Sequence, residues 1–320
     1  MRYLITGGAG FIGSHLAEAL ILRGDHVVIL DDFSTGSRRN LAGLTGTSTL
    51  TILEGSVVDA ELAGRAMDGV DQVIHLAAAV GVRKIMQERV AGIRTNLVGS
   101  ETILAAAAAR RMPLFFASTS EVYGKSTRAA FAEDDDSVIG SSSLHRWSYA
   151  CAKLMDEFLA LAWFHEQHLP VTIARFFNVT GPRQSPEYGM VLPRFCRAAL
   201  AGKSLEVHGS GLQSRCFLHV ADAVAGILLL LDTPAAVGQV VNIGSDEEVT
   251  IGDLARRVIA AAGTGAVIQP TPYAAAFPEG GFEDMQRRVP DIRKLERLTG
   301  WRRQHDLTRT IQDSLRWVQG

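Results

Sequence analysis

Short apolar runs alternate with longer segments of helical periodicity through the first half of the chain. The runs that we assign to strands are residues 3–5, 26–30, 51–53, 72–76 and 113–117. Such short, mostly apolar runs are typical of strands buried on both faces of a parallel sheet. Helical patterns lie near residues 59–67, over 93–109, and in a segment that ends at residue 165. Strands that alternate with helices predict a doubly wound, parallel α/β sheet.

Three glycines at three-residue spacing, Gly7, Gly10 and Gly13, separate the first strand from the first helix. In a strand–turn–helix unit, the first glycine permits a tight turn and the second lets the backbone approach a pyrophosphate. The third lets the helix pack closely on the strand. The helix N-terminus then offers unpaired N–H groups and the positive end of its dipole to phosphates. Because this context stands on both sides of the motif, we predict a Rossmann-type, dinucleotide-binding domain.

Prolines mark a change of pattern after residue 178, as expected of loops that leave the sheet. The elements predicted there are helices at residues 191–200, 250–262 and within 295–318, and strands at 205–207 and 239–243. We expect residues 239–243 to return to the sheet. The predicted division is a dinucleotide-binding domain of residues 1–178, with 213–245 returning to it, and a smaller α/β substrate-binding lobe of residues 179–212 and 246–320.

An acidic residue, Asp31, ends the second predicted strand, about 20 residues after the glycine loop. A carboxylate at this place hydrogen-bonds the ribose 2′-hydroxyl of NAD and repels the 2′-phosphate of NADP, so we predict NAD. Asp32 is a near-equal candidate. Arg38 and Arg39 lie just beyond, and we interpret them as solvated loop charges or substrate-side residues.

Candidate catalytic groups follow the fifth predicted strand. The hydroxyl-rich segment 118–124 begins at its carboxyl end, where open α/β sheets bind their ligands. Tyr149 and Lys153 are four residues apart, so they share one helix face. A neighbouring ammonium labilises the proton of a phenol, and a tyrosinate can accept a proton from a sugar hydroxyl while hydride leaves the same carbon. The spacing therefore predicts a dehydrogenase-type site.

Composition excludes several classes of protein. The 320 residues are 47% hydrophobic and 21% charged, as in ordinary globular proteins, and the net charge of −2 gives no basic footprint for nucleic acid. The three cysteines are too few and scattered for a disulfide framework or a thiolate metal site, and we expect no metal. The apolar run 228–231 is too short to span a membrane. With a strand starting directly at the N-terminus, we expect a cytoplasmic protein without a signal peptide.

These motifs together resemble the extended short-chain dehydrogenases/reductases that modify nucleotide sugars. The matching segments are residues 6–13, 75–78, 118–124, Tyr149 with Lys153, 175–182 and 214–219. The resemblance implies tightly held NAD, oxidation of a hexose at C4 to a 4-keto intermediate, and a homodimer formed through the helices of Asn96 and Tyr149. The cofactor contacts that it implies are Gly7, Gly10, Phe11, Ile12, Gly13, Asp31, Val57, Leu76, Ala77, Ala78, Tyr149 and Lys153. The substrate contacts that it implies are Asn178, Val191 and Arg215.

The residues beside the Tyr–Lys pair bear on the reaction. Thr119 and Glu121 resemble the set in GDP-mannose 4,6-dehydratases and UDP-glucuronate decarboxylases, whereas 4-epimerases usually carry a small or hydroxyl residue in place of Glu121. Thr119 would hydrogen-bond the C4 oxygen. Glu121 would be an additional proton-transfer group, because elimination and decarboxylation need an acid or base near C5 and C6.

A segment near the C-terminus, residues 283–292, resembles the corresponding part of UDP-glucuronate decarboxylases. Arg288 falls where those enzymes place an arginine near the sugar carboxylate, which a guanidinium can hold bidentately. The leading prediction is therefore decarboxylation of a UDP-glucuronate-like sugar. A 4,6-dehydratase, a 4-epimerase acting on a UDP-sugar, and a catalytically idle NAD sensor remain as alternatives.

Overall fold

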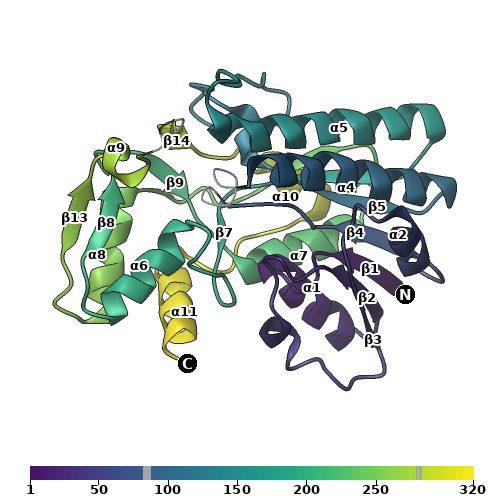
Figure 1. Ribbon diagram of the computed structural model, residues 1–320, viewed down its shortest axis with the longest axis horizontal. Coiled ribbons are helices and arrows are strands. Elements are labelled where there is room, and N and C mark those ends of the chain that lie inside the picture. The colour runs from purple at the N-terminus through teal and green to yellow at the C-terminus, as the bar shows by residue number, and fades with distance from the viewer. Residues whose placement is uncertain (82–87, 279, 281–282) are drawn as a thin grey trace.

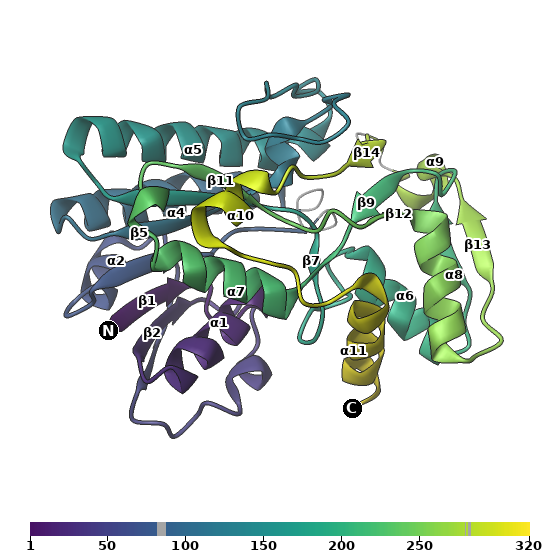
Figure 2. The ribbon, with the colours of Figure 1, turned by 180° about the vertical axis from the view of Figure 1, so that it is seen from behind.

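A seven-stranded parallel sheet forms the centre of the larger half of the molecule (Figures 1 and 2). The computed structural model describes residues 1–81, 88–278, 280 and 283–320. The strands, in their order across the sheet, are β11 (Val240–Ile243), β6 (Val171–Phe176), β5 (Leu114–Thr119), β4 (Gln72–His75), β1 (Arg2–Thr6), β2 (His26–Asp31) and β3 (Leu50–Glu54). The chain order reverses between β1 and β4, which is where ligands bind in sheets of this kind.

Helices cover both faces of this sheet, which confirms the doubly wound architecture. One face carries α1 (Phe11–Leu22), α7 (Val220–Leu231) and α10 (Arg293–Thr299), and the other α2 (Ala60–Ala66), α4 (Arg89–Ala109) and α5 (Ser148–Gln167). Side chains along β1 alternate between the two cores. Tyr3 and Ile5 pack with α1 and α7, while Leu4 packs with α2 and α4.

The smaller lobe lies beside the larger half (Figure 1), and its buried side chains form a core of their own. Its helices are α6 (Val191–Leu200), α8 (Ile251–Ala262), α9 (Tyr273–Ala276) and α11 (Leu307–Gln319), and its strands are β8 (Leu205–His208), β13 (Ile268–Thr271), β12 (Glu248–Thr250), β9 (Ser214–Cys216) and β14 (Arg287–Arg288). Two further strands, β7 (Val179–Thr180) and β10 (Leu218–His219), pair between the halves. In the described ranges, no helix combines the length and the hydropathy that a membrane span requires.

The element predictions hold in most places. As predicted, β11 returns to the sheet and pairs with β6. The helix predicted from residue 93 begins four residues earlier, at Arg89. The predicted division assigns residues 213–245 to the larger half and 246–320 to the lobe. In the structure, β9 pairs with the lobe strands β12 and β14, while α10 packs against α7 and β11 of the larger half.

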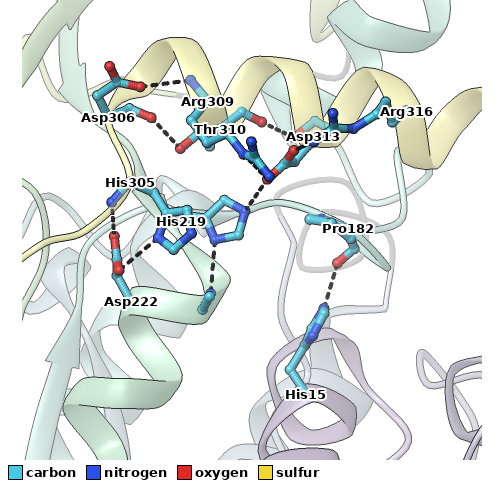
Figure 3. A network of polar contacts seen from close by, with 12 residues as sticks. His15, Pro182, His219, Asp222, His305, Asp306, Arg309, Thr310, Asp313 and Arg316 are labelled. Atoms are coloured by element: carbon cyan, nitrogen blue, oxygen red, sulfur yellow. Dashed lines mark hydrogen bonds and ion pairs between the residues drawn. The ribbon is translucent and has the colours of Figure 1, made fainter.

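Stacked histidines join the lobe to the larger half (Figure 3). The rings of His219 and His305 lie 4.3 Å apart at 16°. The Nδ1 of His219 accepts the N–H of Ala221, and its Nε2 lies 3.4 Å from a carboxylate oxygen of Asp313 on α11. Asp222 on α7 binds the ring of His305 at 2.9 Å. Burial and the neighbouring His305 lower the pKa of His219 to about 4. The contact between the lobe and the larger half therefore includes a histidine ring that is uncharged at neutral pH.

Candidate active site

The glycine loop leaves the end of α1 open. Gly7 adopts a positive φ of 72°, and a Cβ at Gly13 would lie 2.3 Å from the carbonyl oxygen of Gly7. A Cβ at Gly7 would in turn approach the backbone nitrogen of Ala77 to 2.8 Å. Close packing therefore requires the first and third glycines. Gly10 precedes α1 and gives it no side-chain cap, so the first N–H groups of the helix remain available to a diphosphate.

The carboxylate of Asp31 holds the glycine loop from the end of β2. It accepts the backbone N–H groups of Ala9 and Phe33, each at 2.8 Å, and burial raises its pKa. Its two oxygens retain further lone pairs for ribose hydroxyls. Asp32 is exposed and binds the N–H of Ser34. The open helix end and this carboxylate fit the dinucleotide that the motif predicts.

The predicted Tyr–Lys pair lies on α5 and is buried. The side chain of Thr119 favours the ionised form of Tyr149, but burial outweighs it and raises the pKa of the phenol above its ordinary value. Burial lowers the pKa of Lys153, whose ammonium lies 4.5 Å from the ring centroid of Phe116. The nitrogen is 3.4 Å from a carboxylate oxygen of Asp156, one turn further along the helix. Thr119 ends β5 beside Tyr149, whereas the ammonium of Lys153 lies against Phe116, nearer the middle of that strand.

Two guanidinium groups enclose the carboxylate of Glu121. Arg146 contacts one oxygen through an ion pair, and Arg288 donates to the other at 3.0 Å. All three side chains are at least 86% shielded from solvent. The two positive charges outweigh the burial and lower the pKa of Glu121 to about 2. Glu121 is therefore an anion at neutral pH while both arginines stay in place.

A second guanidinium–carboxylate pair lies next to the first. Arg215 donates to Asp284 at 2.7 Å, and burial together with the repulsion of Arg288 lowers the pKa of Arg215 to about 10. The other branch of Arg288 binds the side-chain oxygen of Asn178. Among the described residues, Arg146, Arg215 and Arg288 thus meet the carboxylates of Glu121 and Asp284, and the charge of Glu283 also acts on Arg146.

These groups line a cavity of about 950 Å³ between the sheet and the lobe. The predicted site residues on its wall are Glu121, Tyr149, Asn178, Val191, Arg215 and Arg288. Thr119 and Lys153 are not part of this wall. Leu76, Ala77 and Ala78 follow β4, and Leu76 and Ala77 lie against Gly7 of the glycine loop. Val57 is buried after β3. The wall also includes His208, whose Nε2 is 2.9 Å from Arg194 and whose ring meets Phe277 edge-on.

Three residues of the site were not predicted from the sequence: Arg146, Asp284 and Asp156. Arg146 and Asp284 form ion pairs with segments 25 and 69 residues away, which no local pattern indicates. Asp156 carried a usable signal, because it stands one helical turn after Lys153.

Comparisons with known proteins identify the family of this chain. Residues 3–244 match the model of the NAD dependent epimerase/dehydratase family. The chain belongs to this family. It is 41% identical to a UDP-N-acetyl-alpha-D-glucosaminuronate decarboxylase of Bacillus cytotoxicus, over 99% of this chain and 98% of that protein. It is 34% identical to UDP-glucuronic acid decarboxylase 1 of Xenopus tropicalis, over 94% of this chain and 68% of that protein.

A solved structure in this family has the same fold throughout. The UDP-glucuronic acid 4-epimerase of Bacillus cereus, in complex with UDP-glucuronic acid and NAD, superposes with a TM-score of 0.90 at 27% identity. The match covers 100% of this chain and 99% of the epimerase. The predicted family, the Rossmann-type fold and the NAD cofactor are therefore confirmed. The chain is an NAD-dependent enzyme that acts on nucleotide sugars, and the interpretation as an idle sensor is set aside.

Proposed function

We propose that this enzyme decarboxylates a UDP-hexuronate by way of a 4-keto sugar. The observation that carries the proposal is the pair of guanidiniums, on Arg146 and Arg288, that meets Glu121 beside Tyr149. Arg288 can exchange Glu121 for a sugar carboxylate, while Arg146 keeps its ion pair with Glu121. The 41% identical relative, named for its action on UDP-N-acetyl-glucosaminuronate, supports a carboxylated substrate.

The residues divide the chemistry among them. Tyr149, with Lys153 beside it, accepts the proton of the C4 hydroxyl. When bound, NAD supplies the hydride acceptor for C4 and later the hydride donor. Oxidation at C4 makes the C6 carboxylate that of a β-keto acid. Thr119 hydrogen-bonds the C4 oxygen, where the electron pair of the C5–C6 bond accumulates as carbon dioxide leaves. C5 then takes up one proton, so the overall reaction consumes a proton and yields a UDP-pentose.

The pKa of Glu121 should rise when Arg288 binds the substrate carboxylate instead of Glu121. Paired with two arginines, it has a pKa of about 2 and cannot donate a proton near neutral pH. A sugar carboxylate that takes over Arg288 leaves Glu121 with Arg146 alone and adds a second negative charge nearby. Both effects raise the pKa of Glu121 towards the range of a proton donor. We therefore assign to Glu121 the proton transfer near C5.

Product analysis tests the reaction directly. The NAD-loaded enzyme is incubated separately with UDP-glucuronate, UDP-N-acetyl-glucosaminuronate, UDP-glucose and GDP-mannose, and the products are read by mass spectrometry. We expect loss of carbon dioxide from a uronate and no conversion of neutral sugars. Loss of water from a neutral sugar would instead establish a 4,6-dehydratase. A uronate product of unchanged mass, with a new C4 configuration, would establish 4-epimerisation, the activity named for the structural neighbour from Bacillus cereus.

We also propose a homodimer built on α4 and α5, which lie side by side (Figure 1). Cys151, Met155 and Phe158 share one face of α5 at helical spacing, and Met155 and Phe158 are 59% and 63% exposed. Val90 on α4 is 73% exposed. Large apolar side chains gathered on one surface are typical of subunit interfaces. Light scattering should give twice the mass of one chain, and Phe158→Glu should yield monomers. A monomeric wild-type enzyme would refute this proposal.

A further inference from the structure

A buried carboxylate accompanies the catalytic lysine. Asp156 lies one turn after Lys153 on α5, and the two side chains are 1% and 2% exposed. One oxygen of Asp156 is 3.4 Å from the ammonium and accepts the hydroxyl of Ser100, from α4, at 2.8 Å. Its other oxygen is buried without a hydrogen-bond partner among the described residues. The ammonium therefore faces one carboxylate on one side and the ring of Phe116 on the other.

The neighbouring acid, Glu157, is engaged elsewhere. It accepts the guanidinium of Arg175 through both oxygens and the hydroxyl of Ser118. A bidentate pair of this kind satisfies the buried carboxylate and fastens α5 to β6. Asp156 has no such set of donors. Two adjacent acids on one helix thus have different environments, and only Asp156 is directed at Lys153.

Stability does not explain the Lys153–Asp156 pair. Moving two charges out of water costs more free energy than a loose ion pair regains. Apolar residues of similar volume at such positions often give a protein of equal or higher stability. A carboxylate oxygen that is buried without a donor adds to this cost. Such an arrangement makes sense where the charge itself is needed.

Uncharged groups hold the carboxylate in place. Ser100, which binds Asp156, lies 3.4 Å from the Nε2 of His75 on β4, and the Nδ1 of His75 is 2.7 Å from the hydroxyl of Thr6 on β1. All these side chains are buried. Burial and the charge of Lys153 keep the pKa of His75 well below its ordinary value, so this ring remains neutral. The chain of contacts fixes Asp156 without supplying a competing cation.

We infer that Asp156 is a positioning residue that keeps the ammonium of Lys153 charged and held on the face of α5 that Lys153 shares with Tyr149. The inference rests on the roles of Tyr149 and Lys153 in the proposed function, whichever reaction follows oxidation at C4. The titratable groups that face this centre are Lys153 and Tyr149 with Asp156 and Glu157 on α5, His75 on β4, Glu121 after β5, and Arg288 from β14.

Removal of the Asp156 charge should move both ionisations in one direction. The negative charge favours the ammonium of Lys153 against burial and opposes the tyrosinate of Tyr149. In Asp156→Asn, Lys153 should lose its proton at lower pH, and Tyr149 should also ionise at lower pH. The alkaline and the acidic limbs of the activity profile should therefore both shift to lower pH. A purely structural role would lower activity or stability without moving either limb.

The test uses the full-length, NAD-loaded enzyme and the nearly isosteric Asp156→Asn. We expect the pH at which kcat falls on the alkaline side to decrease by about one unit or more. This corresponds to a change of about tenfold or more in the protonation equilibrium of Lys153. At pH values above the wild-type alkaline limb, activity should fall about tenfold, while KM changes by less than about twofold. Glu166→Gln removes an acid from the exposed end of the same helix and should leave the profile unchanged. Coincident profiles for Asp156→Asn and wild type would overturn the inference.

Two further measurements make the test decisive. Ser100→Ala removes only the hydroxyl that holds Asp156 and should shift the profile in the same direction by less. If Asp156→Asn does not fold, an unchanged Ser100→Ala profile overturns the inference. The ultraviolet absorbance of tyrosinate, referenced to Tyr149→Phe, needs no turnover. It should appear at lower pH in Asp156→Asn, even if every tested sugar proves to be the wrong substrate.

Discussion

Replacement of Arg146 by Met should destabilise the protein through Glu121. Glu121 has an ordinary pKa of 4.5 and a pKa of about 2 in the fold, which corresponds to roughly 3 kcal/mol in favour of its charged form. The guanidiniums of Arg146 and Arg288 together cause this pKa shift, and they also offset the free-energy cost of burying the carboxylate. Loss of one should therefore lower the free energy of unfolding by about 2–3 kcal/mol at pH 7, near the range for breaking a buried ion pair.

Denaturant unfolding of Arg146→Met and wild type measures this difference. The exposed Arg302, paired with Glu296 at 2.8 Å, provides a matched control, and Arg302→Met should cost less than about 1 kcal/mol. A carboxyl group whose pKa is lowered by folding contributes stability above its unfolded pKa and loses it as the pH falls. The difference between wild type and Arg146→Met should therefore shrink below about pH 4.5. A loss at pH 7 below about 0.5 kcal/mol would refute the reasoning.

Three other outcomes follow from the geometry. Arg288→Ala should weaken the binding of UDP-glucuronate to the NADH-loaded enzyme about tenfold or more and that of UDP-glucose much less; equal losses in calorimetry would remove its role as carboxylate partner. Gly13→Ala should reduce NAD affinity at least about tenfold, because its Cβ would meet the oxygen of Gly7 at 2.3 Å, whereas Gly43→Ala, with open space around it, should bind NAD normally. The buried neutral His219, with a pKa of about 4, binds fewer protons than an unfolded histidine, so thermal stability should fall between about pH 6.5 and 4, and His219→Gln should flatten that dependence.

Local patterns revealed the sheet and the glycine loop because their causes lie within a few residues. The alternation of Tyr3, Leu4 and Ile5 and the tight contacts of Gly7 and Gly13 all arise within the first strand–helix unit. The Tyr149–Lys153 pair was found for the same reason, since one helical turn fixes its spacing.

Ion pairs between distant segments could not be predicted in this way. Arg288 reaches Glu121 across 167 residues of chain, and that contact depends on how β14 is seated beside β9. The sequence indicated Glu121 as a proton-transfer group and Arg288 as a carboxylate partner, but it gave no sign of Arg146 or of the pairing of both arginines with Glu121. The placement of β9 in the lobe sheet also depends on its pairing with β12 and β14, which the sequence of β9 alone does not specify.

Asp31 holds the glycine loop in addition to its predicted contact with the ribose. These two roles limit how the preference of this enzyme for NAD over NADP can be re-engineered. Substitutions that admit a 2′-phosphate usually begin by deleting this acid. Here the same carboxylate receives the N–H of Ala9, in the turn that cradles the diphosphate, and that of Phe33, which has a positive φ of 55°. A variant that discards the acid would loosen the turn as it removes the repulsion. A neutral replacement such as Asn or Ser offers one acceptor oxygen in place of two, so a switch to the phosphorylated dinucleotide needs a second acceptor for the turn as well as a new cation in the loop that follows β2.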